Sequence, residues 1–246
     1  KKFEATVRCC TQNGIRGGSA TVHFPIWHQE IEDILVLKNN KGTEDNRVRK
    51  LDYSIQISKL FYERFLAAGE ISLFSPHDVP GLYDSFGTES FDELYVKYEN
   101  DSSVPRKTIG AQDLILDLLK ERAETGRIYI MNIDHCNSHS SFIDKVEMSN
   151  LCQEITLPTK PIQHIDDPEG EIALCILSAI NVGTLKDVSE LENLCDISVR
   201  ALDEIIDYQD YPVKAAEVST KARRSLGIGY IGLAHYLAKN GVKYSD

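Results

Sequence analysis

Three side chains of complementary chemistry occupy alternate positions in the segment SNLCQEI, residues 149–155. We expect this segment to be extended, and alternate side chains of an extended backbone share one face. Asn150, Cys152 and Glu154 would then project together, with Leu151 and Gln153 on the opposite face. An amide, a thiol and a carboxylate on one side could bind a polar substrate, react with it and move a proton. The motif is short, and a partly exposed strand with an incidental cysteine has the same spacing.

A second cysteine, Cys175, lies in the apolar segment GEIALCILSAIN, residues 170–181, which we expect to form a strand. Cysteine buried in such a strand usually behaves as a small hydrophobic side chain, so taken alone Cys175 belongs to the core. The chain has six cysteines and no CxxC pair, which argues against a disulfide scaffold and against a zinc ribbon. We therefore expect a reduced, cytoplasmic setting, in which a redox-active cysteine pair would be catalytic.

The segment CTQNGIRGG, residues 10–18, predicts a polar, glycine-rich loop that begins at Cys10. Gln12 could pair with the edge of a nucleobase, and Arg16 could reach a base or a phosphate. Gly14, Gly17 and Gly18 permit the backbone excursions that a switching loop needs. An ordinary glycine-rich surface loop is the plain alternative.

The composition is that of a globular protein, with 42% hydrophobic and 26% charged residues. The net charge of −11 argues against a surface that coats nucleic acid, although local arginines or backbone amides could still bind nucleotides. No apolar run approaches the roughly 18 residues of a membrane span. The chain does not begin with Met, and neither end reads as a terminus. We therefore expect an internal piece of a longer polypeptide, residues 1–246 being the central part of its catalytic domain.

Hydrophobic periodicity and turn residues predict strands separated by helices, which is typical of the α/β class. Expected strands are residues 20–27, 71–74, 127–132 and 171–180, with 149–157 extended. Expected helices are residues 1–8, 29–37, 51–66, pieces of 82–122, 187–207 and parts of 214–238, with 134–149 as a loop.

Two further patterns carry less weight. Residues 227–232 read GIGYIG, which fits the dinucleotide-binding GxGxxG, but the preceding residues are polar and basic where that site needs a strand. Close helix packing accounts better for these glycines. The segment DHCNSH, residues 134–139, contains metal-ligand types, for which hydrogen bonding within a loop is the simpler explanation.

The two cysteine segments and their surroundings resemble the catalytic large subunit of class I ribonucleoside-diphosphate reductases. The resemblance rests on SNLCQEI and GEIALCILSAINVG, and on flanking text that includes LFSPHDVPGLYD, ERAETGRIYIMNIDHCNSHS, LPTKP, DYQDYP and RRSLGIGYIGLAHYLAK. It extends over essentially the whole chain and is similar to the enterobacterial and T-even-phage type. It implies part of a ten-stranded α/β barrel with a central finger loop, from which the upstream and C-terminal segments are missing.

The resemblance also implies roles for the matching residues. Cys152 matches the cysteine that becomes a thiyl radical, Glu154 the carboxylate that takes the 3′-hydroxyl proton, and Asn150 the amide that positions the ribose. Asn150, Leu151, Cys152, Gln153 and Glu154 together match the substrate-binding stretch. Cys175 matches one half of the redox-active dithiol, whose partner lies upstream in the family.

Cys10, Gln12, Gly14 and Arg16 match the loop between the specificity-effector site and the substrate base. The implied partners are a metal-containing, radical-generating small subunit, ribonucleoside diphosphates, ATP and dNTP effectors, and thioredoxin or glutaredoxin as reductant. A homodimer of the full subunit is also implied. The resemblance implies no metal or other cofactor in this subunit.

Three rival interpretations stay open at this point. The first is a cobalamin-dependent or glycyl-radical nucleotide reductase, which has the same barrel and finger loop. The second is a catalytically inert binding or assembly module of a split reductase subunit. The third is a nicotinamide-dependent oxidoreductase, which rests only on the glycine motif.

Overall fold

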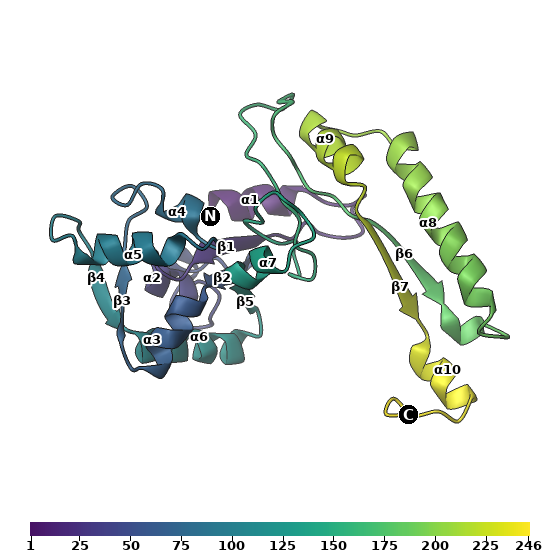
Figure 1. Cartoon of the computed structure of the whole chain (residues 1–246), viewed down its shortest axis with the longest axis horizontal. Helices are drawn as coiled ribbons and strands as arrows, with labels where there is room; N and C mark the ends of the chain where they lie inside the picture. Colours follow the sequence, from purple (N-terminus) through teal and green to yellow (C-terminus); the bar gives the residue numbers. More distant parts are fainter. The chain divides into compact units, whose positions relative to one another are not determined.

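The chain folds into two compact units in a computed structural model that describes residues 1–246 (Figure 1). The first unit comprises Lys1–Pro158 and the second Thr159–Asp246. Both are α/β in character, with parallel strands connected through helices. The predicted fold class is therefore confirmed. None of the helices is both long and apolar enough to cross a membrane.

A parallel sheet of three strands organises the first unit. Its order is β1 (Thr21–Pro25), β2 (Asp52–Ile57) and β5 (Ile128–Asn132). The central strand β2 is buried along nearly its whole length, because helices cover one of its faces and a loop covers the other. Tyr53, Ile55 and Ile57 point to the helical face and belong to the hydrophobic core.

Helices and a second small sheet complete this unit (Figure 1). β3 (Glu70–Leu73) and β4 (Lys107–Gly110) pair antiparallel. The helical segments are α1 (Lys2–Cys9), α2 (Ile31–Leu35), the 3-10 turn η1 (Glu44–Asn46), α3 (Lys59–Leu66), α4 (Leu82–Ser85), α5 (Phe91–Asn100), α6 (Ala111–Thr125) and α7 (Ile133–Ser138).

An aromatic cluster fills the core between α3 and α5. Phe61 has ring contacts with Phe86, Phe91 and Tyr95, at centroid separations of 5.3 to 6.3 Å. The buried Tyr95 hydroxyl donates to the Ser72 carbonyl at 2.7 Å, which ties α5 to β3. Such ring contacts stabilise the core beyond the free energy that hydrophobic burial alone contributes. This cluster therefore stabilises the part of the unit that packs against the sheet.

The second unit is built on two parallel strands, β6 (Ile176–Asn181) and β7 (Leu226–Ile231). Their crossover contains the 3-10 turn η2 (Val182–Thr184) and the helices α8 (Glu190–Tyr208) and α9 (Lys214–Arg223), and α10 (Leu233–Lys239) follows β7. α8 runs alongside the strand pair (Figure 1). Glu171, which precedes β6, is buried. It accepts hydrogen bonds from Arg223 at the end of α9 and forms an ion pair with Lys160. Glu171 therefore connects α9 to the start of the sheet.

Several expected elements were wrong or missing. Residues 52–57 form a strand within the stretch 51–66 where a helix was expected, because their apolar side chains face a helical layer while Ser54 and Gln56 face a loop. β4 and β7 were missed, the first because it is only four residues long. Residues 133–138 form α7 where a loop was expected.

Candidate active site

The face of the three-stranded sheet opposite the helices carries the candidate site. Thr21, His23, Ser54 and Gln56 lie on this face, since the register pairs His23 with Ser54. The loop that contains Cys152 covers it. The Thr21 hydroxyl donates to the Leu151 carbonyl at 2.6 Å, and the Gln56 amide donates to the Glu147 carbonyl. The polar residues of these strands are therefore explained by the loop they bind.

His23 is a titratable group on this face, and its ring nitrogens are buried near the Ser149 backbone. Desolvation by burial lowers the pKa of His23 from its ordinary value of 6.5, so the imidazole is neutral at pH 7. His23 thus adds no charge to the surface that the loop covers.

The segment around Cys152 is a tight turn, and the expected extended conformation was wrong. The Gln153 amide donates to the Asn150 carbonyl at 3.2 Å, and Gln153 has a φ of +68°. Asn150 and Ile155 close the base of the turn, since the Ile155 amide donates to Asn150 Oδ1 at 3.0 Å. Strand alternation therefore does not align Asn150, Cys152 and Glu154 on one face. Asn150 closes the base of the turn with its side chain, and Cys152 and Glu154 follow it.

The side chains of the turn divide into exposed and inward-facing groups. Cys152 is an exposed, free thiol, and Glu154 is also exposed. Asn150, Leu151 and Gln153 are half-buried. Gln153 points into the unit, where its amide contacts Ser54 and the Ile130 carbonyl. A free thiol and a carboxylate are thus exposed on a turn whose other residues anchor it.

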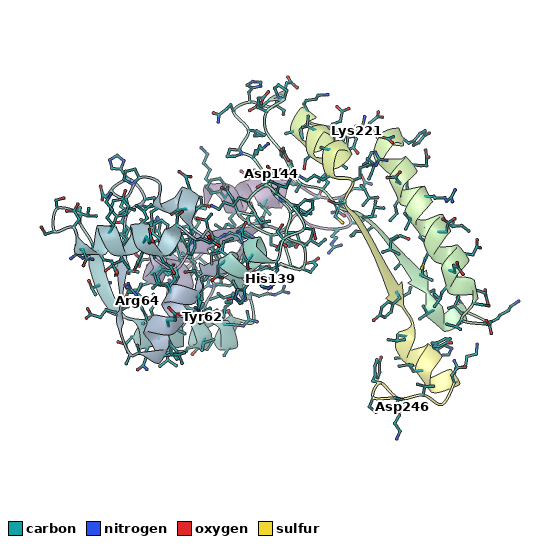
Figure 2. The ribbon with its side chains drawn as sticks, in the orientation of Figure 1. Tyr62, Arg64, His139, Asp144, Lys221 and Asp246 are labelled. Atoms are coloured by element: carbon teal, nitrogen blue, oxygen red, sulfur yellow. The ribbon has the colours of Figure 1, made fainter.

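A pocket of about 370 Å³ adjoins this turn at the carboxyl end of β5. Its lining includes His135, Cys136 and His139, which the sequence analysis considered as metal-ligand types and assigned to hydrogen bonding within a loop (His139 is labelled in Figure 2). The two imidazole rings lie edge to face, with centroids 5.6 Å apart. No group of three or more His, Cys, Asp or Glu side chains is placed to hold a metal ion.

The loop at residues 10–18 forms a small exposed hairpin. Gln12 and Arg16 pair across it, with the Gln12 amide donating to the Arg16 carbonyl at 2.8 Å. Asn13 and Gly14 both have positive φ, at 50° and 70°, as the first and second central residues of a type I′ turn require. Gly18 is a glycine for a different reason: a Cβ there would lie 2.2 Å from the Val7 carbonyl oxygen.

Cys175 directly precedes β6 and does not lie inside the strand as expected. It is half-buried, and desolvation raises the pKa of its thiol above the ordinary value of 9.0. A Cβ at Gly227 would lie 3.4 Å from its sulfur and 2.5 Å from the Leu177 side chain. The first glycine of GIGYIG therefore leaves room for residues at the start of β6.

The glycine motif lies on a strand, which corrects the expected helix packing. Gly227 and Gly229 are within β7, and Gly232, with a φ of +75°, begins α10. A dinucleotide site needs these glycines in the loop between a strand and a helix. Their placement gives no support to nicotinamide binding.

Near Cys175, the charged groups that hold the strand are paired. Although desolvation alone would raise it, hydrogen bonds from Lys160 and Arg223 hold the pKa of Glu171 below its ordinary value of 4.5. Glu171 is therefore ionised at neutral pH, and its ion pairs with Lys160 and with Arg223 of α9 are intact there.

Comparison with known proteins identifies the fold to which both sites belong. The family model described as the barrel domain of ribonucleotide reductase matches residues 1–246. The chain is 58% identical to the ribonucleoside-diphosphate reductase subunit alpha of Haemophilus influenzae, 54% identical to a subunit alpha of Escherichia coli, and 44% identical to that of Enterobacteria phage T4. Each match covers 100% of this chain and 33% of the relative, so the chain spans about a third of their length. The chain belongs to the ribonucleotide reductase family, within its barrel domain.

Proposed function

We propose that this chain is the central part of the barrel in a class I reductase alpha subunit, which converts ribonucleoside diphosphates to deoxyribonucleoside diphosphates. The proposal is supported by the full-length family match and by relatives named as ribonucleoside-diphosphate reductase alpha subunits. The observation that carries it is the turn at residues 150–153, which presents a free, exposed thiol beside an exposed carboxylate.

In the proposed reaction Cys152, as a thiyl radical, takes the hydrogen atom from the 3′ carbon of the ribose. Glu154 accepts the 3′-hydroxyl proton while the 2′-hydroxyl leaves as water. Asn150 hydrogen-bonds the substrate hydroxyls and so positions the ribose against the thiol. Such chemistry needs the thiol and the base against one sugar ring, and residues that share one turn are suited to that.

Cys175 supplies one thiol of the reducing pair in this proposal. Two thiols deliver two electrons and two protons: one hydrogen leaves with the 2′-hydroxyl as water, the other replaces that hydroxyl on the 2′ carbon, and the pair becomes a disulfide. Cys152 then returns its hydrogen atom to the 3′ carbon, and the thiyl radical is regenerated. The balance is one ribonucleotide and one dithiol consumed for one deoxyribonucleotide, one water and one disulfide.

The proposed reaction requires further proteins and ligands. A metal-containing small subunit generates the radical, and thioredoxin or glutaredoxin reduces the disulfide. Nucleoside triphosphate effectors act through the loop at residues 10–18, where Gln12 and Arg16 are exposed, and the full subunit forms a homodimer in the cytoplasm.

The direct test is Cys152→Ser in the full-length subunit, assayed with its small subunit. We expect loss of nucleotide reduction to below about 1% of wild type, because an oxygen radical on serine is far harder to form than a thiyl radical. The matched control is Cys195→Ser, another exposed free thiol, which should retain wild-type turnover. Turnover of Cys152→Ser above a few per cent would instead favour the rival interpretation. In that case this chain is a catalytically inert module, and the radical cysteine lies in another part of the enzyme.

A further inference from the structure

Gln153 has an inward side chain, although it follows the reactive thiol directly. The buried Ser54 hydroxyl, on a residue with 0% exposure, donates to Gln153 Oε1 at 2.8 Å. Gln153 Nε2 donates to the Ile130 carbonyl at 2.9 Å. One amide thus bridges the central strand β2 and the outer strand β5.

We propose that Ser54 and Gln153 form a positioning pair that sets where Cys152 stands above the sheet. This inference rests on the proposed function, since it concerns the same site. Cys152 lies between two anchored neighbours: Leu151, held through its carbonyl by Thr21, and Gln153, held through its side chain. The thiol itself stays exposed between these anchors.

The backbone gives an independent reason for the pair. The backbone of Gln153 lies in the left-handed region, at φ +68°. Residues other than glycine and asparagine rarely adopt this conformation. Such a conformation persists where surrounding contacts determine it, and the two amide hydrogen bonds are those contacts. Gln153 therefore acts through the backbone of Cys152, and its side chain is directed away from the exposed face of the turn.

Positioning matters here because hydrogen-atom transfer requires near contact. A displacement of about 1 Å in a reacting group can lower a rate by about 100-fold. An unpaired Ser54 hydroxyl or Gln153 amide would seek another partner and shift the turn, because a buried polar group left without a hydrogen bond is costly. Removing both polar groups together leaves neither member of the Ser54–Gln153 contact unpaired, and such paired replacement can be nearly neutral. The Ile130 carbonyl loses its Gln153 donor equally in Gln153→Leu and in the double variant.

The test is a double-mutant cycle with Ser54→Ala and Gln153→Leu in the full-length subunit with its small subunit. We expect each single variant to lower kcat about tenfold, with KM for the nucleotide unchanged, since binding groups are intact. The double variant should lose no more activity than Gln153→Leu alone, about tenfold, and not the roughly 100-fold loss of two independent effects. Thermal unfolding of each variant is measured alongside, and a role in stability alone would lower Tm without changing kcat.

Two further variants keep the outcome decisive. Gln153→Asn tolerates the left-handed backbone but is one carbon too short for both contacts, so it should lose activity as Gln153→Leu does. Gln29→Leu, at an exposed glutamine of the same unit, is the control and should be silent. Wild-type kcat in the single variants, or additive losses in the double variant, would overturn the pair. A failure of the proposed function would appear differently, as an active Cys152→Ser enzyme.

Discussion

The two cysteines to which we assign chemistry differ in their surroundings. Cys152 is exposed at the tip of a turn, where a substrate can reach it. Cys175 is half-buried at the start of β6, against Gly227. This contrast is consistent with the two proposed roles, Cys152 as the thiyl radical and Cys175 as a reducing thiol. A reducing thiol should be protected from electrophiles other than the substrate.

Burial of Cys175 leads to a prediction for its alkylation. Desolvation raises the pKa of the Cys175 thiol above 9.0, so at pH 8 a smaller fraction of Cys175 is thiolate than of an ordinary cysteine. The thiolate is the form that reacts with an alkylating agent. Iodoacetamide should therefore modify Cys175 more slowly than Cys152 in this chain, and the Cys175 rate should keep rising with pH beyond 9. Mass spectrometry of timed samples from pH 7 to 10 measures both rates. A Cys175 rate that levels off below pH 9 would contradict the assigned environment.

At the scale of elements, the structure depends on loops that are held by strands. The sheet face with Thr21, Ser54 and Gln56 anchors the turn of Cys152 by side-chain hydrogen bonds to that loop. The loop at residues 10–18 has a different design, since a two-residue turn at Asn13 and Gly14 closes it and it is exposed from residues 11 to 17. The first loop is suited to fixed geometry and the second to a change of conformation.

The exposed loop predicts an effect on substrate choice. In the full-length subunit, Arg16→Ala should change which substrate is preferred with each effector by roughly 5- to 150-fold, the range of typical coupling energies. Folding should be unaffected, because an exposed loop arginine contributes little to stability. The measurement is a competition among four ribonucleotides with and without dTTP, dGTP and dATP, with Arg8→Ala, an exposed arginine of α1, as the control.

An equal loss for all substrates under every effector would mean that Arg16 only binds phosphate or supports the fold. An unchanged pattern would make the loop a passive connector.

Sequence reasoning predicted the element types well where periodicity was strong and long. It placed α8 and β5 nearly at their observed bounds, because each has a regular apolar pattern. It failed at β2, because the helical spacing of the apolar residues further along the chain was extended back over residues 51–57. The alternation of apolar Tyr53, Ile55 and Ile57 with polar Ser54 and Gln56 is the local signal of a strand, and it was overlooked.

The candidate site was predicted in composition but not in geometry. Asn150, Cys152 and Glu154 were found as a set, yet the strand that was to align them is a turn. Gln153 was expected on the substrate-binding stretch, whereas its side chain contacts Ser54 and Ile130. A positive φ at glutamine has no signature in the sequence, so the inward side chain could only come from the structure.

At the scale of the whole molecule, the chain is a pair of units, each with its own parallel sheet. Neither sheet closes on itself, since the strand orders are β1-β2-β5 and β6-β7. The chain also spans about a third of the relatives it matches, and the family model describes a barrel domain. The complete barrel is therefore the context in which the proposed chemistry has to be tested.

The central claim is that Cys152 takes the 3′ hydrogen of the substrate and that Cys175 acts afterwards. The measurement is tritium release to water, with free base, from a 3′-tritiated ribonucleoside diphosphate. It compares Cys152→Ser, Cys175→Ser and the double variant, each in the full-length subunit with its small subunit. We predict release from Cys175→Ser, because abstraction still occurs and the unreduced substrate radical decays. Cys152→Ser and the double variant should release none. Tritium release from Cys152→Ser equal to that from Cys175→Ser would contradict the account.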